Sequence, residues 1–282
     1  MSSAFKQVDV FTSKPFKGNP VAVIMDANGL STEQMQTIAN WTNLSETTFV
    51  FPATSDKADY YVRIFTPQSE LPFAGHPTIG TCHALLESGL ISAKDGVVVQ
   101  ECGAGLVKLT IVPGVSTSFE LPDPVITPLS DTQINSLETD LGCAIDKNLR
   151  PALVDVGARW IIARVADAKT VLSAEPAFPQ LAKHNNELKA TGVSIYGNWS
   201  DDHIEVRSFA PACGVDEDPV CGSGNGAVAA FIRSHTNEDK ILKSSQGSVV
   251  NREGALKLTI SNKKVLVGGD AVTCIEGKIR IT

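Results

Sequence analysis

Short apolar runs separated by polar breaks dominate the chain. Runs that are rich in Val, Ile, Thr and Phe and bounded by Gly, Pro, Asn or Asp are typical of β-strands. On this pattern we expect strands at residues 7–11, 21–25, 47–52, 58–66, 96–100, 107–112, 154–156, 160–165, 192–196, 204–209, 249–251, 257–261, 265–268 and 274–281. So many short strands indicate a protein built mainly on β-sheet.

Apolar residues recur at helical spacing in only a few segments. They predict helices at residues 31–42, 77–88, 132–141, 177–186 and 224–234. Ser31 can cap the first helix, and Gln34 three residues later completes a capping box. Many strands with few helices favour an α+β fold, in which each half of the chain forms a barrel-like curled sheet around a central helix.

One short motif occurs twice. VRIFTP at residues 62–67 returns as VRSFAP at residues 206–211, an offset of 144 residues, and a glycine-rich stretch follows each copy. Two further pairs of similar segments keep the same order at offsets between 142 and 146. One pair is QVDVF around Asp9 and LVDVG around Asp155. These matches predict an ancient duplication, although many two-layer domains share such local patterns.

A proline-rich segment, residues 121–128, predicts the link between the two halves. We therefore expect an N-terminal domain of residues 1–121 and a C-terminal domain of residues 122–271. The chain has 282 residues, which suits two domains at about 100–200 residues each.

Charge and composition narrow the function. The net charge of −7, with 24 basic and 31 acidic residues, argues against nucleic acid as the main partner. The sequence holds no apolar run of about 20 residues, so we expect no membrane span. Lys6 and Asp9 precede any long apolar stretch, which is unlike a secretory signal and favours a cytoplasmic location. Six scattered cysteines without a CxxC pair predict reduced thiols and no metal site.

The two glycine-rich stretches are candidate anion sites. Residues 74–78 and 222–226 each precede or begin a predicted helix. Helix N-termini carry unpaired N–H groups and the positive end of the helix dipole, and glycine lets a carboxylate or phosphate approach them closely. The alternative is that the glycines only permit tight packing of helix on sheet. Two such loops at matching places in a duplication favour binding.

Two titratable residues in the first half could carry chemistry. Glu46 lies between a predicted helix and an apolar strand, where partial desolvation would raise its pKa toward that of a useful general base. The alternative is a capping or turn carboxylate. His76 lies at a predicted helix start, where it could relay a proton or simply bind a backbone carbonyl.

Two further candidates lie in the second half. Asp218 is held by the following Pro219 and could orient His76, touch a substrate amine, or only complement a helix N-terminus. The neighbouring Asp216 and Glu217 are expected to be solvated. Cys221 precedes Gly222 at a predicted helix start, which favours a lowered thiol pKa. It could be a catalytic base or a small buried hydrophobe.

Four segments together resemble the phenazine-biosynthesis PhzF-like isomerase family. They are VDVFTSKPFKGNPVAVI (8–24), NLSETTFVF (43–51), FAGHPTIGT (73–81) and RSFAPACGVDEDPVCGSGNGA (207–227). The resemblance implies a diaminopimelate-epimerase-like fold of two similar domains with the active site between them. It also implies that the last strand, about residues 272–282, returns to the N-terminal domain. Catalysis without a cofactor and a homodimer are implied in the same way.

The resemblance also implies roles for individual residues. Glu46 matches the catalytic glutamate, and His76 and Asp218 match the active-site histidine and aspartate. Residues in the matching segments are expected to contact a small carboxylate-bearing substrate: Asn19, Gly75, Cys221, Gly222, Ser223 and Gly224. The function implied is an isomerase that moves a proton with Glu46 as general base and acid.

Two other functions stay open at this point. CGSG at residues 221–224 looks like one of the two catalytic-cysteine loops of related amino-acid epimerases, but the opposite position is Ala74. A two-cysteine racemase is therefore disfavoured, whereas an epimerase that uses Cys221 with a carboxylate remains possible. The third hypothesis is a catalytically silent protein that binds small molecules.

Overall fold

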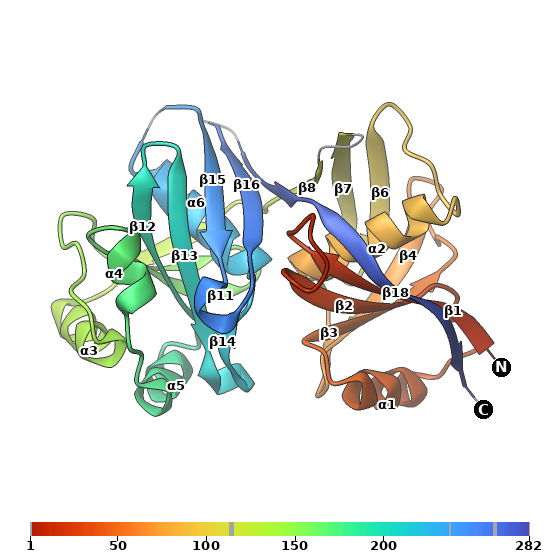
Figure 1. Cartoon of the computed structure of the whole chain (residues 1–282), viewed down its shortest axis with the longest axis horizontal. Coiled ribbons are helices and arrows are strands. Elements are labelled where there is room, and N and C mark those ends of the chain that lie inside the picture. The colour runs from red at the N-terminus through yellow and green to blue at the C-terminus, as the bar shows by residue number, and fades with distance from the viewer. Residues whose placement is uncertain (1, 113–115, 237, 262–263, 282) are drawn as a thin grey trace. The chain divides into compact units, whose positions relative to one another are not determined.

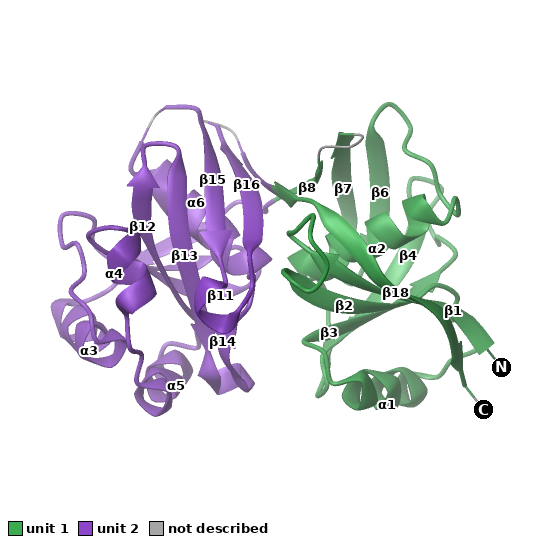
Figure 2. Cartoon of the chain, viewed as in Figure 1, with its two compact units in different colours: residues 1–120, 268–282 green, residues 121–267 purple. Residues whose placement is uncertain are grey.

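The computed structural model describes residues 2–112, 116–236, 238–261 and 264–281. The chain divides into two compact units (Figure 2). Unit 1 comprises Met1–Glu120 and Gly268–Thr282, and unit 2 comprises Leu121–Val267. The final segment of the chain therefore belongs to the same unit as the first. In the described part of the chain, no helix is long and apolar enough to cross a membrane.

Unit 1 is a curved mixed sheet around one buried helix (Figure 1). Its strands are β1 (Ser2–Val10), β2 (Asn19–Ile24), β3 (Glu46–Phe51), β4 (Tyr60–Phe65), β5 (Glu70–Leu71), β6 (Val97–Cys102), β7 (Gly105–Val112), β8 (Ser116–Glu120) and β18 (Ala271–Arg280). They pair in the order β18–β1–β2–β3–β4–β6–β7–β8, with β5 also beside β4. The inner helix is α2 (Gly75–Glu87), and α1 (Thr32–Thr42) packs on β3 and β4.

Unit 2 repeats this plan. Its strands are β9 (Val125–Pro128), β10 (Ala152–Asp155), β11 (Arg159–Arg164), β12 (Gly192–Ser200), β13 (His203–Ala210), β14 (Val215–Asp218), β15 (Lys240–Gln246) and β16 (Gly254–Ile260). β17 (Val265–Gly269) crosses the boundary between the units along the chain. The inner helix is α6 (Gly222–Ser234). The other helices are α3 (Asp131–Leu141), α4 (Ala168–Ser173) and α5 (Phe178–Glu187), with short 3-10 turns η1 (Pro211–Cys213) and η2 (Ser248–Val250).

Strand registers show that the two units share one topology. β2 runs parallel to β3 with Val21 opposite Glu46, and β11 runs parallel to β12 with Trp160 opposite Gly192. In both units the next strand returns antiparallel and is followed by a short strand and the inner helix. The predicted α+β fold, with a curled sheet around a helix in each half, is confirmed. By this register the counterpart of Glu46 is a glycine, so the carboxylate is particular to unit 1.

Side chains alternate between the two faces of each sheet, and apolar side chains cover both faces. In unit 1 the buried side chains Ile24, Phe49 and Phe65 pack with Met35 and Ala39 of α1 on the outer face. In unit 2 the outer core joins β11, β12 and β13 to α3 and α5 through side chains such as Ile161, Val193, Phe209, Leu137 and Leu181. The residues between them in sequence face the inner helix, because side chains alternate along a strand.

Several predicted elements agree with the structure. The predicted capping box is present, since the Ser31 side chain accepts from the Gln34 backbone and the Gln34 side chain accepts from the Ser31 backbone. The strand predicted at residues 249–251 is wrong: the chain there forms η2, because Gly247 and Asn251 on either side adopt left-handed backbone conformations that turn the chain. Part of the proline-rich link, Val125–Pro128, forms β9 along β10.

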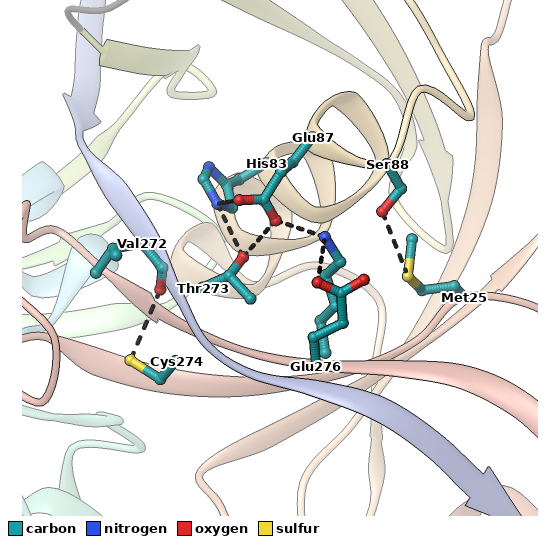
Figure 3. A network of polar contacts seen from close by, with 9 residues as sticks. Met25, His83, Glu87, Ser88, Val272, Thr273, Cys274 and Glu276 are labelled. Carbon is teal, nitrogen blue, oxygen red and sulfur yellow. Dashed lines mark hydrogen bonds and ion pairs between the residues drawn. The ribbon is translucent and has the colours of Figure 1, made fainter.

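The last strand is tied into unit 1 by more than its pairing with β1. A polar network joins β18 to the end of α2 (Figure 3). The Thr273 hydroxyl donates to Glu87 Oε2 at 2.7 Å and lies 3.1 Å from His83 Nε2. The buried ammonium of Lys6 in β1 donates to the same carboxylate oxygen of Glu87. Glu87 thus links three elements of unit 1.

Candidate active site

Glu46 begins β3 and faces the inner helix of unit 1. α1 ends at Thr42, the following C-cap residue Asn43 adopts a left-handed conformation, and the chain then turns into β3. Side chains two residues apart on a strand share a face. Thr48 accepts a hydrogen bond from Thr81 of α2 at 2.8 Å, so Glu46 lies on the same inward face. Its side chain is 15% exposed.

His76 is the second residue of α2, and its imidazole lies against the Glu46 carboxylate. Nε2 of His76 is 3.3 Å from Oε2 of Glu46, and the His76 side chain is 7% exposed. Gly75 precedes it where a Cβ atom would come within 2.7 Å of the Phe119 ring. A glycine at this position therefore lets the start of α2 lie against β8, which places the imidazole beside the carboxylate.

Burial sets the protonation behaviour of Glu46. It raises the pKa of the Glu46 carboxyl to about 7, against the smaller, opposite effect of the Ser45 hydroxyl. The Ser45 hydroxyl also lies 3.3 Å from Oδ1 of Asn19, a buried residue that begins β2. The desolvation expected from the sequence is therefore present. A carboxyl with such a pKa is available near neutral pH both as a base and as an acid.

The two inner helices begin differently. In α2 the N-cap residue Ala74 contributes no side-chain hydrogen bond, and Pro77 has no N–H to offer. In α6 the N-cap is Cys221, whose Sγ accepts from the Gly224 N–H at 3.2 Å. Ala74 and Cys221 thus hold equivalent cap positions. A thiol is available at one of them only.

The start of α6 rests on buried polar side chains. Ser223 Oγ accepts a hydrogen bond from the indole N–H of Trp160 at 3.1 Å. The hydroxyls of Ser194 and Ser208 lie 2.8 Å apart, and a Cβ at Gly224 would come within 2.6 Å of both. Gly224 is therefore needed for this close approach. Trp160 was not among the site residues predicted from the sequence, although it is the one aromatic residue of β11, which reads RWIIAR.

Cys221 is a protonated thiol rather than a thiolate. Burial raises its pKa well above the ordinary value, and the nearby negative charge of Asp218 adds to this effect. The predicted lowering of the Cys221 pKa is therefore wrong. Loss of water around the sulfur has a larger effect on the Cys221 pKa than the hydrogen bonds from Ser223 and Gly224, which act to lower it.

The turn before α6 is held by its acidic residues. Oδ1 of Asp218 accepts from the Val220 N–H at 3.0 Å, which closes the turn through Pro219. Glu217 was expected to be solvated, and that prediction is wrong. Its carboxylate binds the buried Arg207 guanidinium through two hydrogen bonds of 2.9 and 2.8 Å. Asp216 is exposed, as predicted.

The arginine of the repeated motif makes an ion pair of this kind in both units. In unit 1 Arg63 binds Glu70 through two hydrogen bonds and lies over the Phe65 ring. In unit 2 Arg207 binds Glu217 in the same way and lies over the Phe209 ring. In each copy the arginine anchors the short strand that leads into the inner helix.

The structure thus forms two clusters from the predicted residues. Unit 1 brings Glu46, His76 and Gly75 together, with Asn19 linked through Ser45. Unit 2 brings Asp218, Cys221, Gly222, Ser223 and Gly224 together at the start of α6. Among the described residues, no group of three or more His, Cys, Asp or Glu side chains could hold a metal ion.

Comparison with known proteins identifies the class. A solved PhzF-family phenazine biosynthesis protein from Bacillus anthracis has a TM-score of 0.86 and 25% identity, with 100% of both chains covered. A hydroxyproline epimerase from Agrobacterium vitis, 14% identical, shares the fold with a TM-score of 0.65 over 99% of this chain and 92% of its own. The chain is an isomerase of this α+β architecture.

The family is also shown directly. The family model of the phenazine biosynthesis-like proteins, PhzC-PhzF, matches residues 8–277, and the chain belongs to this family. Antisense-enhancing sequence 1 of Schizosaccharomyces pombe is 46% identical over 289 residues, which cover 98% of each protein. The uncharacterized isomerase mll1393 of Mesorhizobium japonicum is 32% identical over 301 residues, which cover 97% of each.

Proposed function

We propose that this protein is a cofactor-independent isomerase that moves a proton on a small carboxylate-bearing substrate, with Glu46 as general base and acid. The observation that carries the proposal is the buried Glu46 carboxyl, with its pKa of about 7, 3.3 Å from the His76 imidazole. A general base works best when its pKa lies near the working pH.

The proposed reaction conserves atoms and charge. The Glu46 carboxylate removes a proton from a substrate carbon, and the electron pair left behind shifts through the conjugated system toward the substrate carboxylate. The protonated Glu46 then gives the proton to a different carbon of that system. His76 lies close enough to hydrogen-bond Glu46 or a substrate oxygen, and so to keep the carboxyl in place. The double bond moves, and Glu46 is regenerated.

Substrate carboxylate binding is assigned to the helix starts. The N-termini of α2 and α6 present the positive ends of two 13-residue helices. Gly75 in unit 1, with Gly222, Ser223 and Gly224 in unit 2, leaves these backbones approachable. Donors at such positions also stabilise the negative charge that develops when the proton leaves carbon. Asn19 and Asp218 are proposed to bind further polar groups of the substrate.

An epimerase that uses Cys221 requires a different group as its catalytic base. It needs a thiolate that removes a proton from an α-carbon, and the raised pKa of Cys221 opposes this. The two reactions therefore separate on which residue is required.

Solvent exchange tests the proposal. The protein is incubated in D₂O with a panel of conjugated cyclic dienoic acids, amino acids and hydroxy acids, and deuterium in each compound is followed by NMR. Wild type, Glu46→Gln and Cys221→Ser are compared, with Glu187→Gln as a matched change at an exposed glutamate.

Deuterium that enters a substrate carbon with wild type, Glu187→Gln and Cys221→Ser but not with Glu46→Gln supports the proposal. Exchange at an α-carbon that is lost in Cys221→Ser would establish the epimerase instead. No exchange with any compound, together with NMR shifts on binding, would indicate a silent binding protein and would reject the proposed catalysis for these classes.

A further inference from the structure

We propose that Gln246 is a positioning residue that sets the shape of residues 218–225, the turn that carries Asp218 and the start of α6. The inference rests on the proposed function, because it links this turn to substrate binding. Gln246 is the last residue of β15 and is 1% exposed.

The carboxamide of Gln246 contacts the turn at three places. Its oxygen accepts from the Cys221 N–H at 3.1 Å and from the Asn225 side-chain amide at 2.7 Å. Its nitrogen donates to the Asp218 carbonyl at 2.9 Å. One side chain therefore joins the beginning, the middle and the end of the turn.

The orientation of this carboxamide is dictated by its partners. A backbone N–H can face only an acceptor, and a backbone carbonyl can face only a donor. The Cys221 N–H and the Asp218 carbonyl therefore require the oxygen and the nitrogen of the carboxamide on opposite sides. Asn225 is held as well, because its amide also donates to the Cys221 carbonyl at 2.9 Å and its oxygen accepts from Ser244.

The backbone around Gln246 is shaped to the same turn. A Cβ at Gly247, where φ is +99°, would lie 2.4 Å from the Pro219 carbonyl oxygen. A Cβ at Gly254 on β16 would lie 2.5 Å from the Val220 side chain. Two glycines thus let β15 and β16 come against the turn closely enough for the carboxamide to reach it.

The strand registers show that the Gln246 contact is particular to unit 2. Tyr60 lies opposite Gln100 in unit 1, and Ile204, its counterpart 144 residues later, lies opposite Ser244 in unit 2. Gln100 therefore corresponds to Ser244, and both side chains donate to the inner helix, Gln100 to the Thr78 hydroxyl at 2.9 Å and Ser244 to Asn225. Gln246 lies two residues further along β15, where unit 1 has Cys102. We infer that this additional carboxamide serves the alignment of Asp218 and the α6 amides.

A change of Gln246 to Glu turns this contact into one that pH can switch. A protonated carboxyl can accept from Cys221 and Asn225 and donate to Asp218, as the carboxamide does. The ionised form cannot donate, and it faces the Asp218 carbonyl with a negative oxygen. The titratable groups of the turn are Asp218 and Cys221. Burial and the negative charge of Asp218 both favour the protonated form of the carboxyl that Gln246→Glu introduces.

The experiment compares Gln246→Glu with wild type across pH 5.5 to 8.5. Gln36→Glu serves as the matched control, because Gln36 also donates to a backbone carbonyl, that of Thr66, but on α1. Two properties are measured: amide hydrogen exchange of residues 218–225, relative to wild type at the same pH, and kcat and KM. A displacement of about 1 Å in a positioned group can lower turnover roughly 10²-fold.

We expect Gln246→Glu to match wild type at low pH and to lose amide protection and at least about tenfold in kcat/KM as pH rises. Gln36→Glu should show neither effect. Unchanged protection at high pH would overturn the proposal, and so would lost protection with unchanged kcat/KM.

Failure of the proposed function has a separate signature. If wild type turns over none of the compounds, the link to binding is judged with benzoate as a carboxylate probe, titrated by NMR. Weaker binding of benzoate to Gln246→Glu at high pH, with lost amide protection, would keep the positioning role without the isomerase. Equal benzoate affinity in the two proteins would reject the role.

Discussion

Oε2 of Glu46 lies 3.3 Å from Nε2 of His76, although the two residues belong to different elements of unit 1. Glu46 is the first residue of β3, and His76 is the second residue of α2. Both side chains are largely buried, so their interaction is weakly screened. A buried carboxyl whose pKa reaches about 7 beside an imidazole is costly for folding, which is typical of a functional site.

Turnover should depend on pH through this carboxyl. Glu46 acts as a base only when ionised, so kcat/KM should rise with pH through about 7 and then level off. Glu46→Gln should lose about 10²–10⁴-fold at pH 8, where Glu46 of wild type is ionised, and should not show this rise with pH. The measurement is kcat/KM from pH 5 to 9 for wild type and Cys221→Ser. A rise centred near pH 4.5 would contradict the role assigned to burial.

The same carboxyl should reduce the stability of the folded protein at high pH. A group whose pKa is raised in the folded state favours folding below its unfolded pKa, 4.5, and loses that contribution as pH rises through about 7. The shift corresponds to about 3 kcal/mol at pH 8. Glu46→Gln should therefore be more stable than wild type at pH 8 in urea unfolding, by up to this amount. A less stable Glu46→Gln at pH 8 would refute the expectation.

A methyl group at Gly75 should disturb unit 1 through one ring. The added Cβ would meet Phe119 Cζ at 2.7 Å, and the ring is fully buried. We expect Gly75→Ala to cost about 1–3 kcal/mol, because an overpacked core must move. The double variant Gly75→Ala with Phe119→Leu should recover part of the loss.

Gly277→Ala is the control for this change, since nothing lies within 4 Å of an added Cβ there. Its stability should stay within about 0.5 kcal/mol of wild type. Thermal unfolding of the four proteins measures these differences. Equal losses for Gly75→Ala and Gly277→Ala would show that the Phe119 contact is not the cause.

Cys221 should be replaceable by serine. Its sulfur caps the Gly224 N–H, and a serine hydroxyl is a favoured N-cap acceptor. Because the thiol is buried and protonated, we expect little change in kcat and no labelling of Cys221 by iodoacetamide in the folded protein at pH 8. Mass spectrometry of peptides containing Cys213 and Cys221 measures the labelling, with the exposed Cys213 as the internal comparison. Rapid labelling of Cys221 would show that its thiol is ionised.

The two partners of the Lys6–Glu87 ion pair should differ in how much stability is lost when each is replaced. The Lys6 side chain is 4% exposed and that of Glu87 is 44% exposed. Glu87→Gln leaves the buried Lys6 ammonium only the exposed Glu276 carboxylate, 3.9 Å away, and should cost about 2–3 kcal/mol. Lys6→Met leaves a carboxylate that water can reach and should change stability by less than about 1 kcal/mol.

The double variant Lys6→Met with Glu87→Gln should regain most of the loss of Glu87→Gln. Urea unfolding of the four proteins completes the cycle. If Lys6→Met were the more damaging single change, packing of the lysine chain would outweigh its charge. The buried ammonium would then not be what requires Glu87.

Local pattern explains much of what could be predicted. The alternation of apolar and polar residues predicted strands in the curled sheets of both units. The glycine-rich helix starts indicated Gly75 and Gly222 as candidate site residues. The capping box at Ser31 was readable because its partners are three residues apart. β15 lacks the apolar alternation of a strand because two of its three buried residues, Ser244 and Gln246, are polar, and its pairing with β13 and β16 depends on distant parts of the chain.

Electrostatics could not be predicted in the same way. Glu217 and Cys221 have neighbours that suggest solvation and a lowered thiol pKa, yet one is paired with Arg207 and the other is buried beside Asp218. Both outcomes depend on how much water the folded chain leaves around a group, and sequence spacing does not contain that quantity.

The sequence by itself determined the duplicated α+β plan, the family resemblance and the identity of the chemically capable residues, because strand alternation, helix capping and motif order are properties of neighbours along the chain. Only the tertiary structure decided that Glu46 meets His76, that the thiol of Cys221 stays protonated, and that Gln246 holds the turn before α6. Each of these depends on contacts between residues far apart in sequence and on the removal of water from the groups they enclose.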